Sequence, residues 1–121
     1  MPFDSVYHES TLTRQELEKM AGPVVLEFGV NWCGICSAFA PQMKTLLDDF
    51  PAVTHIKVED GRGKPLGRSF RVKLWPTLVF LRDGNVVQQL ARPSRAAARE
   101  GLTSITGKAM SESERPSTPG H

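Results

Sequence analysis

Residues 24–47 are VVLEFGVNWCGICSAFAPQMKTLL, and within this stretch the apolar pattern changes from strand-like to helix-like. Val24 to Val30 is an apolar run interrupted only by Glu27, which predicts a buried central strand. From Cys33 to Phe50, apolar residues recur instead at helical spacing. Pro41 lies inside that helix, where it removes a backbone hydrogen bond and should cause a kink. A strand is therefore expected to lead almost directly into a helix.

The only two cysteines of the chain, Cys33 and Cys36, lie at this junction. If Cys33 opens the helix, the two Cα atoms are about one turn apart, within the roughly 4.4–6.8 Å that a disulfide requires. The helix N-terminus should lower the pKa of Cys33 below its usual value of about 8.5 and make it the nucleophile. Cys36, one turn deeper, would then resolve the mixed disulfide.

The bulk composition favours a single globular domain. The chain has 121 residues, of which 40% are hydrophobic and 23% charged. The N-terminus lacks the features of a secretion signal, and no apolar run approaches the roughly 18 residues of a membrane helix. We therefore expect a cytoplasmic protein that does not bind membranes. Thiols in the cytosol are kept reduced, and a Cys-x-x-Cys pair there is more often catalytic or metal-binding than structural.

Basic residues are concentrated in the second half of the chain. The segment 57–73 carries six lysines and arginines against two acidic residues. This excess could attract acidic protein partners, or it could be a solvated surface without a partner, and the sequence leaves both open. Nucleic-acid binding is not expected, because Phe70 is the only aromatic residue within the basic segment.

The remaining patterns predict short helices and strands on either side of residues 24–50. The expected elements are an edge strand at 5–8, a helix at 14–20 behind a capping box, a strand at 53–58, a short helix within 61–71, strands at 77–81 and 86–90 joined by an Asp83-Gly84 turn, and a helix at 95–105. This order predicts an α/β fold, in which a central mixed sheet of four to five strands has helices on both faces. We assign the domain to residues 1–106 and expect the polar segment 107–121 to be a disordered tail.

Further motifs accompany the WCGIC string of residues 32–36. Pro41 follows Cys33 by eight residues, and Trp-Pro-Thr at 75–77 precedes the predicted hairpin. This set resembles the thioredoxin family over about residues 11–105. The resemblance implies a thioredoxin fold and a redox-active disulfide formed by Cys33 and Cys36. It also places Pro76 where the family has a cis-proline.

Glu27 and Lys57 match two further positions of that family, a buried carboxylate that is usually aspartate and a lysine near it. A buried carboxylate is costly unless it is paired or protonated, and Lys57 could pair with it. Burial should raise the pKa of Glu27 toward the range useful for moving a proton to or from Cys36. The alternative is that Glu27 points to an exposed edge and has no role.

The resemblance also implies a surface around Cys33 on which substrates dock. A cis-proline would leave the neighbouring backbone as a short edge for a client strand. The residues expected to contact substrate are Trp32, Gly34, Ile35, Trp75, Pro76 and Thr77. For both Trp75 and Trp32 the alternative is ordinary core packing, although Trp32 beside a reactive thiol could also shield it.

Zinc binding is the competing interpretation of the cysteine pair. A structural zinc site needs four ligands, usually supplied by a second pair. Only His8, His55 and His121 remain, and none is at paired spacing. We therefore expect no metal and no other bound cofactor, and we expect no role for these histidines.

The combined prediction is a monomeric protein-disulfide oxidoreductase that acts as a reductant in the cytosol. Cys33 attacks, Cys36 resolves, and Glu27 assists proton transfer. The partners would be disulfide-containing client proteins and an electron-donating reductase or small thiol.

Two alternatives stay open at the level of the sequence. The bulky Trp75 and the Arg92-Pro93 loop, where the family commonly has glycine, would also suit a client-binding or assembly module with secondary redox activity. Ile35 stands between the cysteines where the family's commonest reductase has proline. The reduction potential, and with it an oxidase or isomerase role, is therefore left undecided.

Overall fold

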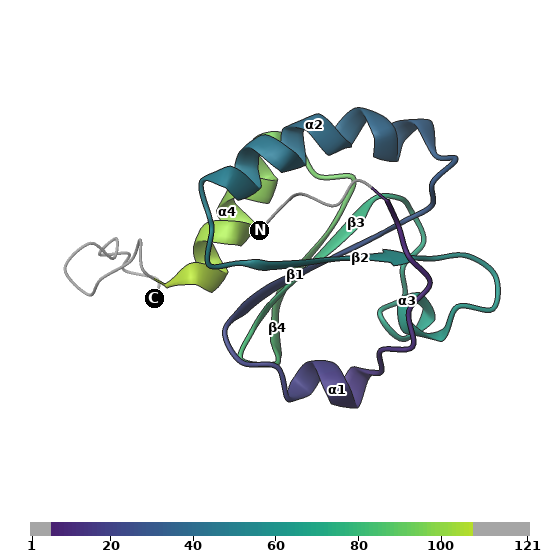
Figure 1. The fold of residues 1–121 in the computed structure, drawn as a ribbon, viewed down its shortest axis with the longest axis horizontal. Coiled ribbons are helices and arrows are strands. Elements are labelled where there is room, and N and C mark those ends of the chain that lie inside the picture. The colour runs from purple at the N-terminus through teal and green to yellow at the C-terminus, as the bar shows by residue number, and fades with distance from the viewer. Residues whose placement is uncertain (1–5, 108–121) are drawn as a thin grey trace.

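The computed structural model describes residues 6–107, within which a four-stranded sheet is flanked by four helices (Figure 1). The elements in chain order are α1 (Arg14–Glu18), β1 (Pro23–Gly29), α2 (Gly34–Asp48), β2 (Thr54–Glu59), α3 (Pro65–Ser69), β3 (Thr77–Arg82), β4 (Asn85–Ala91) and α4 (Arg95–Thr106). The predicted α/β architecture is confirmed.

The sheet is mixed, with strand order β2-β1-β3-β4. β1 and β2 are parallel and are connected by α2, whereas β1 with β3 and β3 with β4 are antiparallel. Figure 1 shows α2 and α4 over one face of the sheet and α1 and α3 over the other. The central position predicted for the first strand is confirmed, and it places the end of β1 beside the start of α2.

Alternation along β1 separates two apolar cores. Val24, Leu26 and Phe28 pack with Leu17 of α1 and Leu66 of α3, whereas Val25 packs with α2 and α4. Glu27 lies two residues after Val25, so its side chain points to the face that α2 covers. The strand period therefore directs the carboxylate toward the helix that carries both cysteines.

Local sequence signals account for the ends of several elements. The Thr13 hydroxyl accepts a hydrogen bond from the Glu16 backbone N–H at 3.1 Å, which forms the expected capping box. Asp83 and Gly84, with φ of 51° and 83°, form the turn between β3 and β4. Ser94 caps α4 by accepting from the backbone N–H of Ala97 at 3.1 Å.

Some predicted boundaries are wrong by one or two residues. α1 ends at Glu18 rather than residue 20, and α2 ends at Asp48 rather than at Phe50. The α2 ending follows from Pro51, because a residue before proline avoids the helical conformation.

The prediction of an edge strand at 5–8 is wrong for the part of this segment that the structure describes. Only a single parallel bridge joins His8 to Val58, so the sheet has four strands there, within the four to five that were predicted. The segments 1–5 and 108–121, including almost all of the predicted tail, lie outside the described residues. None of the helices in residues 6–107 has the length and apolar character needed to cross a membrane.

Candidate active site

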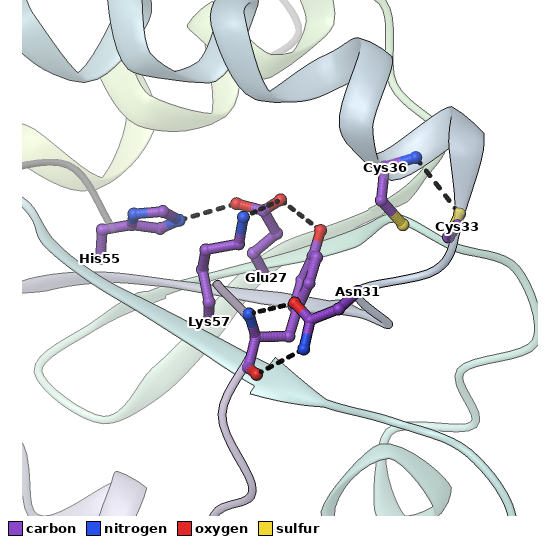
Figure 2. Close-up of polar contacts among 7 residues, drawn as sticks. Glu27, Asn31, Cys33, Cys36, His55 and Lys57 are labelled. Carbon is purple, nitrogen blue, oxygen red and sulfur yellow. Dashed lines mark hydrogen bonds and ion pairs between the residues drawn. The ribbon is translucent and has the colours of Figure 1, made fainter. Parts of the chain in front are cut away.

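The two cysteines lie at the N-terminus of α2, at different depths. Cys33 is the N-cap residue and is partly exposed, whereas Cys36 is only 2% exposed. The Cys33 Sγ accepts a hydrogen bond from the backbone N–H of Cys36 at 3.2 Å, as a capping side chain does. Figure 2 shows this contact at the start of the helix. One sulfur can therefore meet a substrate while the other lies beneath it.

The surroundings of the two sulfurs move their pKa values apart. Burial alone would raise the pKa of the Cys33 thiol, but hydrogen bonds from Cys36 and from the Ile35 backbone, with the charge of Arg92, lower it overall. Burial, together with the hydrogen bond to Cys33, raises the pKa of Cys36 to about 11. Cys33 is therefore favoured as the thiolate, and Cys36 as the thiol that supports it.

The Glu27 carboxylate is fully buried behind this pair and contacts three side chains. The Tyr7 hydroxyl donates to Glu27 Oε2 at 2.6 Å, and His55 Nε2 lies 2.7 Å from Glu27 Oε1. Lys57 Nζ lies 3.8 Å from Oε2. Figure 2 shows His55 and Lys57 directed toward Glu27. The alternative that Glu27 points to an exposed edge is wrong.

The expected direction of the Glu27 pKa shift is also wrong. Burial by itself raises the pKa of Glu27, but the hydrogen bond and charge of His55, the charge of Lys57 and the Tyr7 hydroxyl lower it overall. The sequence indicated burial of the carboxylate but not the number of its partners. With these partners Glu27 is ionised at neutral pH.

Strand register brings His55 and Lys57 to Glu27. Val25 pairs with His55 and Glu27 with Lys57 across the parallel β1–β2 ladder. Residues two apart on a strand share a face, so both side chains lie on the face of Glu27. Tyr7 comes from a separate segment of the chain. The Asn31 side chain fixes that segment, because it accepts a hydrogen bond from the Tyr7 backbone N–H at 2.8 Å and donates one to the Tyr7 carbonyl at 3.1 Å.

Two tryptophans form an apolar surface beside Cys33. Trp32 is 78% exposed, and its ring meets that of Trp75 edge-on, with centroids 5.7 Å apart. Trp75 is held in place because its indole N–H donates to Asp60 at 2.8 Å and its carbonyl accepts from Arg92 Nε at 2.9 Å. The peptide bond between Trp75 and Pro76 is cis.

A second part of this surface lies on the other side of the cis bond. Ile35, Pro76 and Arg92 help to line a cavity of about 180 Å³, and the Ile35 side chain is 46% exposed. Gly34 faces open space. Thr77 differs from the expectation, because its side chain is buried and its hydroxyl donates to the Leu74 carbonyl at 2.6 Å. Thr77 therefore supports the loop rather than contacting a substrate with its side chain.

Comparison with known proteins identifies the family of this fold and cysteine pair. The family model described as Thioredoxin matches residues 5–104. The chain belongs to the thioredoxin family. The solved structure of thioredoxin 2 from Pseudomonas aeruginosa PAO1 in its reduced form is 48% identical with a TM-score of 0.75, and the match covers 85% of this chain and 96% of that one.

Curated thioredoxins from other organisms agree with this result. Thioredoxin-1 of Caenorhabditis elegans is 33% identical over 79 residues, which cover 65% of this chain and 66% of that protein. Thioredoxin of Chlamydia pneumoniae is 33% identical over 89 residues, which cover 73% and 83%. As a thioredoxin-family member with an intact Cys-x-x-Cys pair, the protein is a thiol–disulfide oxidoreductase.

The sequence analysis assigned no role to two residues that contact Glu27 in the structure. His55 was expected to have no role, although its spacing of two from Lys57 on a predicted strand was a usable signal. Tyr7 carries no signal, because only the tertiary fold brings it to Glu27. Residues 6–107 contain no cluster of three or more His, Cys, Asp or Glu side chains that could hold a metal ion.

Proposed function

We propose that this thioredoxin-family protein reduces disulfide bonds of client proteins, with Cys33 as the attacking thiolate and Cys36 as the resolving thiol. The observation that carries the proposal is the asymmetry of the pair: the partly exposed Cys33 has the lowered pKa and the buried Cys36 the raised one.

The reaction would proceed by two exchanges. The Cys33 thiolate attacks one client sulfur, so that a mixed disulfide forms and the first client thiolate leaves. Cys36 loses its proton and attacks the Cys33 sulfur, which releases the second client thiolate and leaves a Cys33–Cys36 disulfide. Two electrons pass from the protein to the client. A reductase or a small thiol of the cytosol would return them, and we expect the protein to work as a monomer.

The client would dock around the cis bond. Trp32 and Trp75 offer an apolar platform next to Cys33, and Ile35 and Pro76 border a groove on its other side. Gly34 faces open space and lets a client approach closely. We assign Glu27 to proton transfer at Cys36, and Lys57 to holding Glu27 ionised.

The positive charge beside Trp75 would favour binding of clients that carry acidic residues. A cavity of about 650 Å³ is lined by Trp75 and by a basic rim, namely Arg62, Lys64, Arg68, Arg71 and Lys73. Lys64 pairs with Glu9 and Glu59, whereas the other four make no ion pair with another residue of the described range. Such a rim would attract a client or reductase that carries acidic residues near its disulfide.

A turnover assay tests the proposal. The protein should catalyse reduction of a model protein disulfide when a thioredoxin reductase or dithiothreitol supplies electrons. Cys33→Ser should abolish catalysis, and Cys36→Ser should accumulate the mixed disulfide. A reduction potential near about −270 mV is expected of a reductant, whereas about −120 to −180 mV would indicate an oxidant or isomerase. Absence of turnover in the unaltered protein, together with tight client binding that persists in Cys33→Ser, would overturn the proposal in favour of a binding module.

A further inference from the structure

The Tyr7 hydroxyl lies close to both the Glu27 carboxylate and the Cys36 sulfur. Its ring is 4% exposed, and its hydroxyl donates to Glu27 Oε2 at 2.6 Å. The same oxygen lies beside Cys36 Sγ, because both atoms border the point where a Cβ atom of residue 29 would stand. A phenol has one proton and two lone pairs. While its proton is directed to the carboxylate, the lone pairs are left to accept the Cys36 S–H.

Gly29 makes this contact sterically feasible. A Cβ atom added there would lie 2.5 Å from Tyr7 Cζ, 2.7 Å from the Tyr7 hydroxyl and 2.8 Å from Cys36 Sγ. The phenol oxygen and the sulfur therefore occupy the space that any other residue at position 29 would need. The sequence has glycine at the one strand position where a side chain would separate the two groups.

Independent contacts hold the Tyr7 ring in this orientation. Lys57 Nζ lies over the ring, 4.1 Å from its centroid, and the Asn31 side chain binds the Tyr7 backbone on both its N–H and carbonyl. A small cavity of about 170 Å³, bordered by Tyr7, Asn31, Cys36 and Lys57, lies beside the sulfur.

We propose that Tyr7 is a catalytic residue of the resolving step and relays the Cys36 proton to Glu27. As the Cys36 sulfur bonds to the Cys33 sulfur, its S–H proton passes to the Tyr7 oxygen and the Tyr7 O–H proton passes to Glu27 Oε2. The Cys33–client bond breaks, and its electron pair leaves with the client thiolate. When the Cys33–Cys36 disulfide is later reduced, Cys36 leaves as a thiolate and recovers the proton by the same route. This relay rests on the proposed exchange reaction.

The groups around Tyr7 favour proton transfer from Cys36 only after Cys33 has bonded to a client. His55 and Lys57 keep Glu27 ionised and able to accept a proton. In the free dithiol, burial and the neighbouring Cys33 sulfur raise the pKa of Cys36 to about 11, so Cys36 keeps its proton. Once Cys33 is bonded to a client it is no longer a thiolate. The Cys33 charge no longer opposes loss of the Cys36 proton, and the proton can then pass to Tyr7.

The reaction with 5,5′-dithiobis(2-nitrobenzoate) separates the two steps in one trace. Attack by Cys33 releases the first thionitrobenzoate, and attack by Cys36 on the mixed disulfide releases the second. In Tyr7→Phe the first phase should keep its rate, whereas the second should slow by about tenfold or more. Glu27→Gln should slow the second phase similarly, and the double variant should be no slower than the slower single variant, because both remove one relay.

The pH dependence gives a readout that a purely structural role would not produce. In the wild type the second-phase rate should be nearly independent of pH around neutrality, because Glu27 accepts the proton internally. In Tyr7→Phe it should rise about tenfold per pH unit, because only preformed Cys36 thiolate can attack.

Two further variants guard against misfolding as an explanation. Gly29→Ala keeps every polar group but places a methyl group against both the Tyr7 hydroxyl and Cys36 Sγ, so the second phase alone should slow. Thr45→Val removes a hydroxyl that bonds the Pro41 carbonyl elsewhere on α2, and both phases should stay unchanged. An unchanged second phase in Tyr7→Phe, or equal slowing of both phases, would overturn the relay. A first phase that persists in Cys33→Ser would instead overturn the proposed exchange reaction.

Discussion

The two sides of the α2 N-terminus differ in how they are assembled. On the exposed side, Trp32 and Ile35 flank Cys33 within four residues of sequence and stay open to solvent. On the buried side, Glu27 and its partners come from three separate segments and are packed behind Cys36. The comparison indicates that local sequence places the residues that flank Cys33 in the chain, whereas the groups around Cys36 are brought together by the whole sheet.

Substitutions on the two sides should therefore affect different properties. Lys57→Met removes a buried cation from Glu27 and should lower the free energy of unfolding by somewhat less than the roughly 3–5 kcal/mol typical of a broken buried pair, because His55 and Tyr7 remain. Trp32→Ala, at an exposed position, should change it by less than about 0.5 kcal/mol but raise KM for a protein client. Chemical denaturation and client kinetics on both variants measure this contrast. Equal destabilisation by the two changes would contradict it.

Acidification should lower the free energy of unfolding through Glu27, on the buried side of the site. The folded-state pKa of Glu27 lies below its unfolded value, so its carboxylate contributes stability above the unfolded pKa. That contribution is lost as pH falls through the folded pKa, below about pH 4.5. Denaturation midpoints of Glu27→Gln should fall less steeply than those of the wild type over this range. Parallel pH curves for the two proteins would show that the carboxylate is not stabilised in the fold.

The smallest effect is expected on the basic rim beside Trp75. Arg68→Glu combined with Lys73→Glu should raise KM for an acidic client by a few-fold at low ionic strength, and added salt should remove the difference. Lys44→Glu, an exposed charge change on α2 outside this rim, is the matched control and should have little effect. A salt-independent change, or the same change in the control, would argue against electrostatic attraction of clients.

The parts of the site that could be predicted are those with a local signal. Cys33 and Cys36 were found from their spacing, and Glu27 because it interrupts an apolar strand. The expected direction of the Glu27 pKa shift was wrong, because burial was visible in the pattern but the neighbouring cation and histidine were not weighed with it. His55 could have been found, since it is two residues from Lys57 on a predicted strand.

The fold was predictable to a similar extent. The mixed sheet followed from the order of apolar runs and from the Asp83-Gly84 turn, whose positive φ angles suit a tight hairpin. Residues 5–8 were expected to form a strand, but only His8 makes a bridge. Pairing at a sheet edge depends on what lies alongside, and a four-residue pattern does not report it.

By itself, the sequence determined the order of the elements and the place of the two thiols, because strand and helix periods, capping and turn chemistry act over a few residues. Only the tertiary structure decided that Tyr7 lies between Glu27 and Cys36, that Gly29 leaves room for it, and that Thr77 is buried. These features join segments about twenty or more residues apart. The register of the strands and the packing of α2 bring them together, and neither is encoded at a single position.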